Sequence, residues 1–90
     1  MAEAEPTHPG AGTYDQYCSI CHDIGVAGAP KIGDAAAWSS RLERGMASLE
    51  MNAINGIASE AGVMPPKGGF AHLSDEEVTA AVAYMVEGSQ

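Results

Sequence analysis

The stretch Cys18-Ser19-Ile20-Cys21-His22 is the part of this 90-residue chain that decides its fold. Two cysteines three positions apart, followed directly by a histidine, form the pattern of a c-type haem attachment site. In such a site each thiol adds to a vinyl group at the porphyrin edge, and the neighbouring imidazole becomes an axial ligand of the iron. The pattern therefore predicts one covalent haem c on Cys18 and Cys21, with His22 as an iron ligand.

A pair of cysteines at this spacing also occurs in redox proteins and in zinc sites. A thioredoxin-like pair is expected within a βαβ unit, and a structural zinc ion needs two further ligands at short spacing. The sequence shows neither pattern, and Cys18 and Cys21 are its only cysteines. We therefore prefer haem attachment to both alternatives.

The length of the chain suggests one domain that needs the cofactor to fold. Ninety residues lie near the lower size at which a chain buries enough apolar surface on its own. A large, flat and apolar haem, tied to the chain at two points, can serve as much of the core. No stretch approaches the roughly 20 continuous apolar residues of a membrane span, so we expect none.

The first residues resemble a tail more than a folded element. Residues 1–9 are acidic and contain two prolines, unlike a basic and then apolar secretory signal. We expect a flexible tail or linker remnant over residues 1–9 and the haem domain over residues 10–90. Because covalent haem attachment takes place outside the bacterial energy-transducing membrane, we expect a periplasmic protein whose signal peptide has been removed.

The charge balance is strongly acidic. Twelve acidic and four basic side chains give a net charge of −8. Nucleic acid binding needs a basic patch, so we exclude it. The acidity can serve solubility alone or the docking of a partner, and the sequence leaves both open.

Two short helices are predicted in the first half of the chain. Gly10, Tyr14 and Cys18 recur at four-residue intervals and indicate one face of a helix that leads into the attachment motif. The Gly/Pro-containing stretch that follows predicts a loop. Asp34 is a good N-cap for a second helix over residues 35–44.

Two more helices are predicted in the second half. Leu49, Ala53 and Ile57 share a helical stripe that ends near Gly56. Ser74 and Glu77 form a capping box at the start of the last helix, whose apolar face is Val78, Ala81, Val82 and Met85. No alternating β-branched run is present, so the sequence predicts an all-α domain without a substantial sheet.

The best candidate for the second iron ligand is Met64. The segment Met64-Pro65-Pro66-Lys67-Gly68-Gly69 cannot be α-helical, because each proline removes a backbone donor and makes the preceding residue extended. Such a stiff strap can present a methionine with little mobility. Packing within helices explains the other internal methionines, Met46, Met51 and Met85. His72 is the next candidate, and His8 belongs to the tail.

Several segments together resemble the class I cytochromes c, and within them the small bacterial cytochrome c5 group. The resemblance runs from about Gly10 to Met85. It rests on the attachment motif and on four further segments, which are Val26-Ala27-Gly28-Ala29-Pro30-Lys31-Ile32-Gly33-Asp34, Ala36-Ala37-Trp38, the Met64 strap, and Leu73-Ser74-Asp75-Glu76-Glu77-Val78.

The resemblance implies a fold of short helices wrapped around one haem, and it implies roles for single residues. His22 and Met64 would be the axial iron ligands. The carbonyl of Pro30 would accept a hydrogen bond from the His22 ring and fix its orientation. Trp38 would either donate its indole N–H to a haem propionate or only fill the core.

The family's crossing of first and last helices implies that Gly10 and Tyr14 meet Tyr84. Two departures from the group are visible. Many members carry another cysteine pair before the last helix, where this chain has residues 69–73 without one. Residues 57–63 also form a longer segment than the group leads us to expect.

The resulting functional expectation is a one-electron carrier rather than an enzyme. With His/Met ligation both axial positions are filled, and the soft thioether and an apolar surrounding favour ferrous iron. We expect partners such as a membrane-bound reductase or a terminal oxidase, and a monomer with a dimer as the alternative. Two other functions stay open: a haem domain through which electrons enter a larger redox enzyme, and a haem-based ligand sensor or peroxidase.

Overall fold

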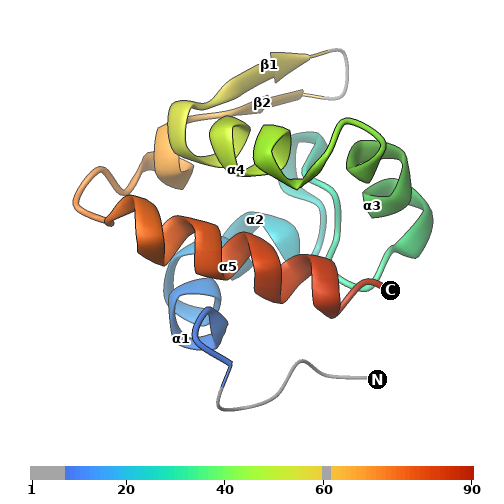
Figure 1. Ribbon diagram of the computed structural model, residues 1–90. Helices are drawn as coiled ribbons and strands as arrows, with labels where there is room; N and C mark the ends of the chain where they lie inside the picture. The colour runs from blue at the N-terminus through green and yellow to red at the C-terminus, as the bar shows by residue number, and fades with distance from the viewer. Residues whose placement is uncertain (1–7, 60–61) are drawn as a thin grey trace.

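The computed structural model describes residues 8–59 and 62–90 as a set of short helices with one small hairpin (Figure 1). The C-terminal helix α5 (Asp75–Glu87) crosses the helical segment at the N-terminus. Helix α4 (Met46–Asn55) packs on α5 from the other side, and the hairpin lies beyond α4. This arrangement confirms the predicted helical class.

The N-terminal helical segment is one continuous stretch with a widened turn in its middle. It begins as α1 (Ala11–Thr13), continues as a π-helical turn over Tyr14–Cys18 and ends as α2 (Ser19–His22). In the π turn the Ser19 N–H donates to the Tyr14 carbonyl, five residues back. Such turns hold one extra residue and often occur at functional sites. Here the turn directly precedes the attachment motif.

Helix α3 (Ala35–Leu42) begins where the sequence predicts, and α4 contains the predicted stripe residues Leu49 and Ala53. The Asp34 carboxylate accepts the Ala37 N–H at 3.1 Å and caps α3. Helix α3 ends two residues before the predicted boundary. Helix α4 ends at Gly56, whose φ of 85° lies in the left-handed region. Ile57 therefore does not continue the helical stripe.

The segment after α4 contains the only sheet among the described residues. Strands β1 (Ile57–Ser59) and β2 (Gly62–Met64) pair antiparallel, with Ile57 opposite Met64. Beyond β2, the strap turns through a single 3₁₀ turn at Pro66–Gly69, within which Lys67 has a φ of 53°. A hairpin of two three-residue strands is compatible with the predicted all-α domain without a substantial sheet, although the sequence did not indicate it.

The capping box at the start of α5 is confirmed. The Ser74 hydroxyl accepts the Glu77 N–H at 3.0 Å, and the Glu77 carboxylate accepts the Ser74 N–H at 2.8 Å. The predicted apolar face of α5 lies in the core. The buried apolar residues of the described chain are Tyr14, Trp38, Leu49, Ala53, Leu73, Val78, Ala81, Val82, Met85 and Val86.

The crossing of the first and last helices is tight. The rings of Tyr14 and Tyr84 lie 5.2 Å apart, as the resemblance implies. Gly10 meets α5 one turn earlier, where a Cβ would overlap the Ala80 carbonyl group. Only a glycine allows the two backbones to approach this closely.

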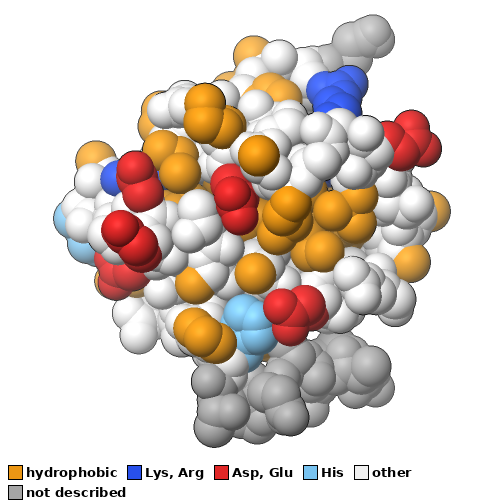
Figure 2. Space-filling view, viewed as in Figure 1, with side chains coloured by type: hydrophobic (Ala, Val, Ile, Leu, Met, Phe, Trp, Pro, Cys, Tyr) orange, Lys and Arg blue, Asp and Glu red, His pale blue; other side chains and the backbone are white. Residues whose placement is uncertain are grey.

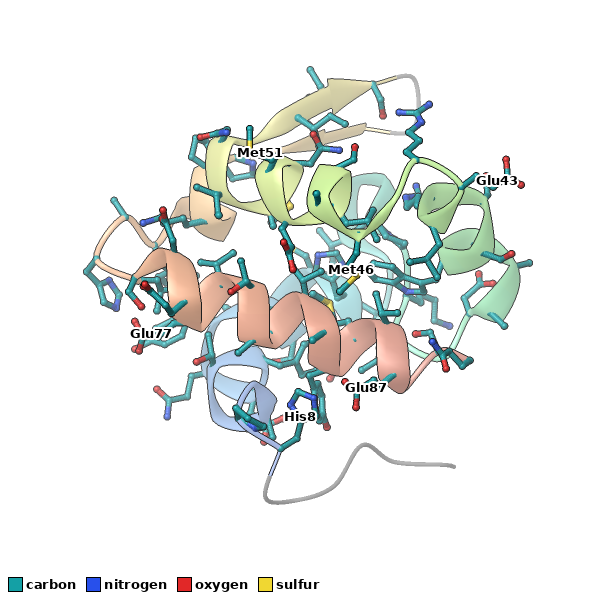
Figure 3. All side chains as sticks on the ribbon, viewed as in Figure 1. His8, Glu43, Met46, Met51, Glu77 and Glu87 are labelled. Carbon is teal, nitrogen blue, oxygen red and sulfur yellow. The ribbon has the colours of Figure 1, made fainter. Side chains whose placement is uncertain are left out.

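His8 lies against α5, which corrects the expectation that it belongs to a tail without fixed geometry. Its Nε2 atom lies 3.1 Å from the Glu87 carboxylate, and its ring meets Tyr84 at 5.4 Å (Figure 3). Its Nδ1 atom accepts the Gly10 N–H at 2.9 Å. The rest of the predicted tail, residues 1–7, lies outside the described residues. Within the described parts, no helix has the length and apolar character that a membrane crossing requires.

Candidate functional site

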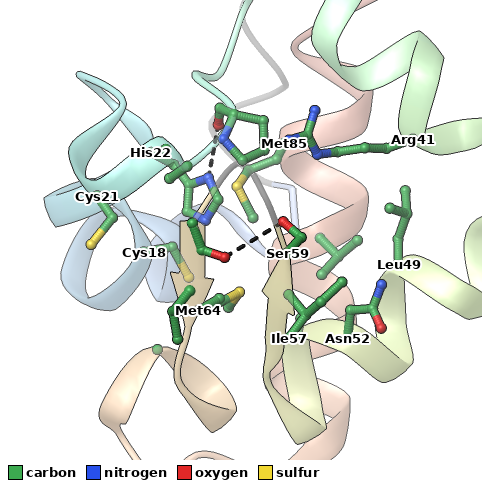
Figure 4. A pocket seen from close by; sticks show the side chains of 18 of the residues that line it. Cys18, Cys21, His22, Arg41, Leu49, Asn52, Ile57, Ser59, Met64 and Met85 are labelled. Carbon is green, nitrogen blue, oxygen red and sulfur yellow. Dashed lines mark hydrogen bonds between the residues drawn. The ribbon is translucent and has the colours of Figure 1, made fainter.

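A cavity of about 550 Å³ opens between the helices, the hairpin and the loop before α3 (Figure 4). Its volume falls in the range of about 300 to 1,000 Å³ that is typical of cofactor and small-molecule sites. The sequence stretches that line it are far apart: the attachment motif, the Gly-Ala-Pro loop, α3, α4, the hairpin with its strap, and α5. The fold therefore gathers nearly every segment of the chain around one space.

The two cysteines occupy one wall of this cavity. Cys18 closes the π turn, Cys21 lies in α2, and both are half-buried free thiols. Residues three apart on a helical segment lie on the same side, so both thiols can reach one ligand edge. Burial, and secondarily the nearby Cys21, raises the pKa of Cys18 to about 11, so this thiol is protonated at neutral pH.

The His22 imidazole faces the same cavity and is only 7% exposed. Its Nδ1 atom lies 2.8 Å from the Pro30 carbonyl oxygen, which can only accept, so Nδ1 carries the proton. Burial lowers the pKa of His22, against the opposing effect of the Pro30 hydrogen bond. The ring is therefore neutral, and its Nε2 lone pair is available to a metal.

Two methionines reach the cavity. Met64, at the end of β2, and Met85, from α5, both line it, and Figure 4 shows both thioethers directed inward. Met85 is 3% exposed and also belongs to the helix core. The lining does not include Met46 or Met51, and the Met51 side chain is 58% exposed.

His72 lies away from the cavity. It is exposed, and its ring packs against Tyr17 at 5.2 Å and Phe70 at 6.3 Å. It lies on the outer surface, between the strap and α5. The structure therefore does not bring His72, the alternative to Met64 as iron ligand, to the cavity.

Trp38 forms part of the cavity wall, but its polar group is already paired. The indole N–H donates to the Lys31 carbonyl at 2.9 Å, and the side chain is 4% exposed. A hydrogen bond from Trp38 to a haem propionate would need this same N–H. The bond to Lys31 also ties α3 to the loop that holds Pro30.

Arg41, Arg44 and Asn52 line the cavity and were not expected there from the sequence. Basic side chains are favourable at the C-terminus of a helix, and this alone accounts for two arginines at the end of the predicted second helix. Their spacing of three places them on one face of the helical turn, which is the only signal that could have drawn attention to them. Arg41 donates one N–H to the Ala37 carbonyl at 3.0 Å and keeps further donors.

The cavity fits a haem better than a bare metal ion. In the described part of the chain, no group of three or more His, Cys, Asp or Glu side chains could hold a metal by itself. The walls are largely apolar, with one neutral imidazole, two thiols and two thioethers. These groups suit a haem, which is an apolar macrocycle that already holds an iron ion. The arginines can pair with the carboxylates of its propionates.

Comparisons with known proteins agree with this geometry. Residues 5–85 match the family described as cytochrome c oxidase, cbb3-type, subunit III. Cytochrome c-555 of Chlorobaculum tepidum is 49% identical over 81 residues, which cover 90% of this chain and 75% of that protein. Cytochrome c5 of Ectopseudomonas mendocina is 44% identical over 72 residues, which cover 78% of both chains.

A solved structure has the same fold. It is described as an electron transfer complex of nitrite reductase with cytochrome c. The matching chain has a TM-score of 0.81 and 36% sequence identity, and the match covers 98% of this chain and 100% of that one. By its motif, its fold and these similarities, the chain belongs to the class I cytochromes c, electron carriers rather than enzymes, which bind haem c covalently.

Proposed function

We propose that the chain carries single electrons on a haem held by Cys18 and Cys21, with His22 and Met64 as the two axial ligands. One observation carries this proposal: all four side chains reach the same cavity. The haem supplies an iron that cycles between the ferric and ferrous states. The cysteines tether it, and His22 and Met64 occupy its axial positions.

The two axial residues have different tasks. The Pro30 carbonyl holds the His22 ring at 2.8 Å, which fixes its orientation and makes Nε2 more basic. The Met64 thioether is a soft ligand that favours ferrous iron and so raises the reduction potential. With both positions filled, no site remains for a substrate or a gas, which favours a carrier over a sensor or a peroxidase.

Met85 is the competing methionine, since it too lines the cavity. Its place inside α5, with 3% exposure, is explained by packing among core residues. Met64 instead ends a strand and precedes two prolines, and it is only half-buried at the edge of the core. We therefore assign the ligand to Met64 and a packing role to Met85.

The covalent tether is tested by acid-acetone extraction followed by intact mass. Extraction should leave the haem mass on the chain, and a Cys18→Ala/Cys21→Ala double variant should lose it. A chain of bare mass after extraction of the native protein would refute the attachment.

The ligand assignment is tested by comparing Met64→Ala with Met85→Ala. Met64→Ala should lower the reduction potential and let the ferrous protein bind carbon monoxide at neutral pH. Met85→Ala should keep the native spectrum and lose about 2 to 5 kcal/mol of stability, as expected for a buried methionine. The reverse result would move the ligand to Met85.

Partners would dock at an apolar patch beside the attachment motif. We call this the mouth patch and define it as Ile20, Ile24, Val26 and Val63, which are 60%, 73%, 42% and 66% exposed. Strand β2, which carries Val63, packs against the Val26–Gly28 turn. Electron-transfer complexes are usually small, below about 1,200 Å² of buried surface, so a patch of this kind can suffice.

The overall charge of the chain indicates the kind of partner. The chain has a net charge of −8, and Figure 2 shows acidic side chains spread over one face with few basic ones. We propose a redox partner with basic groups around its docking site, such as a membrane-bound reductase or a terminal oxidase. The similarity to a cytochrome c found in a complex with nitrite reductase supports a redox enzyme as partner. Covalent haem attachment favours a periplasmic location for this exchange.

A further inference from the structure

Lys67 stands out in the strap that follows Met64, because its backbone conformation is unfavourable for a residue with a side chain. Its φ of 53° makes it the only residue other than glycine with positive φ among the described residues. A Cβ in this left-handed region costs free energy that glycine avoids. Two glycines follow immediately, so the strap has a lysine where a glycine would fit more easily.

The Lys67 side chain makes two contacts that offset this cost. Its ammonium donates to the Leu73 carbonyl at 2.6 Å and lies 3.1 Å from the Asp75 carboxylate. The lysine side chain is 19% exposed, and Leu73 is in the core at 3% exposure. The bond to Leu73 is therefore charge-assisted and partly shielded from water, which makes it the stronger of the two. Asp75 is 64% exposed and contributes less.

The two contacts connect the strap to the start of α5. Backbone hydrogen bonds at 3.0 Å join Gly68 to Pro65, Phe70 to Lys67 and Leu73 to Phe70. The ammonium closes the remaining gap between Lys67 and the first turn of α5. The segment from Met64 to α5 is thereby held at both ends, since Met64 also pairs with Ile57 in the hairpin.

We propose that Lys67 is a positioning residue that keeps the Met64 thioether in the cavity by holding the strap on α5. This inference rests on the proposed role of Met64 as the axial ligand. Loss of the two contacts lets the strap move away from α5, and the fraction of molecules with Met64 outside the cavity rises. An external ligand that competes with Met64 then binds more tightly in proportion to that fraction.

The test is imidazole binding to the ferric haem-loaded protein, followed by absorption. Lys67→Met removes both contacts and keeps the apolar stem, and the apparent imidazole affinity should rise about tenfold. Lys67→Gly also relieves the positive φ and should show the same rise, so it carries the test if Lys67→Met folds poorly. Asp75→Asn keeps the Leu73 bond, and its affinity should change less than about threefold.

Two further variants separate the possible outcomes. Lys31→Met removes the same charge from an exposed site and should bind imidazole as the native protein does. Met64→Ala should bind imidazole at least as tightly as Lys67→Met. An unchanged spectrum and affinity in Met64→Ala would refute the ligand assignment itself. Native affinity in both Lys67 variants, with Met64→Ala altered, would overturn the role of Lys67 and leave the ligand assignment intact.

A purely stabilising role for Lys67 predicts a different pattern. In that case thermal unfolding followed by circular dichroism would shift to lower temperature, while imidazole affinity well below the transition would stay native. A rise in affinity at temperatures where the helical signal is unchanged supports positioning, and its absence contradicts it.

Discussion

Gly10 lies so close to Ala80 that a Cβ at Gly10 would overlap the Ala80 carbonyl oxygen. The obstacle is helix backbone rather than a flexible side chain, so the two helices would have to separate. Gly10→Ala should therefore destabilise the protein by about 1 to 3 kcal/mol or more, in the range of overpacked cores. Urea unfolding followed by circular dichroism measures this.

Gly12 is the matched control for this prediction. It lies two residues away in α1, and a Cβ there would meet nothing within 4 Å. Gly12→Ala should leave stability unchanged or raise it by about 0.5 to 1 kcal/mol, as expected for alanine in a helix. Equal losses in the two variants would show that the close approach to α5 is unimportant.

Removal of the haem should abolish most of the ordered structure. Without the haem, the largely apolar walls of a cavity of about 550 Å³ would be exposed to water. The whole stability of a small domain is only about 5 to 15 kcal/mol, and a chain of 90 residues has little other core to offset the loss. The Cys18→Ala/Cys21→Ala double variant, prepared without haem, should therefore have a weak helical signal and no sharp thermal transition. A cooperative transition at the native temperature would contradict the expectation.

The capping box predicts a pH dependence that a single variant can isolate. The Ser74 backbone N–H, by donating to the Glu77 carboxylate, lowers the pKa of Glu77 below its ordinary 4.5. A carboxyl whose pKa is lower in the folded state stabilises the fold above its unfolded pKa, and this stabilisation is lost as the pH falls. Glutamine at this position keeps the hydrogen bond but has no charge.

The Tm of the native protein should therefore exceed that of Glu77→Gln at pH 7. This difference in Tm should become smaller as the pH falls below about 4.5. Other carboxylates titrate in both proteins, so their contributions cancel in the comparison. A difference in Tm that stays constant from pH 7 to pH 3 would exclude the charge of Glu77 as its cause.

Salt should slow electron exchange with a basic membrane-bound partner. The net charge of −8 steers such a partner over a Debye length that falls from about 10 Å at 0.1 M salt to about 3 Å at 1 M. The second-order rate should fall steeply over this range, while reduction by an uncharged small molecule should not change. If the rate with the protein partner stays constant or rises with salt, electrostatic steering is excluded, and apolar docking at the mouth patch remains as the explanation.

The sequence predicted the elements whose signals are local. The Asp34 cap and the Ser74/Glu77 capping box are short patterns of side chain and backbone, and both form as expected. The attachment motif and the proline-containing strap drew attention to Cys18 and Met64, and both residues line the cavity. In each case a few neighbouring residues determine the geometry.

Features that depend on distant partners were missed. Strands of three residues are too short to show alternation, so Ile57 was assigned to the helical stripe of α4. No local pattern predicts the contact of His8 with Glu87, which lies 79 residues away. The arginines at the cavity wall were explained by the end of α3 alone, because nothing nearby in sequence indicates what they face.

The π turn at Tyr14–Cys18 sets the angular phase between the two halves of the first helix. Each residue of an α-helix advances the direction of its side chain by about 100°, so one extra residue in a turn rotates everything after it. Before the turn Gly10 meets α5, and at the end of the turn Cys18 faces the cavity. A chain shortened by one residue between them could keep the helix crossing or the thiol orientation, but not both.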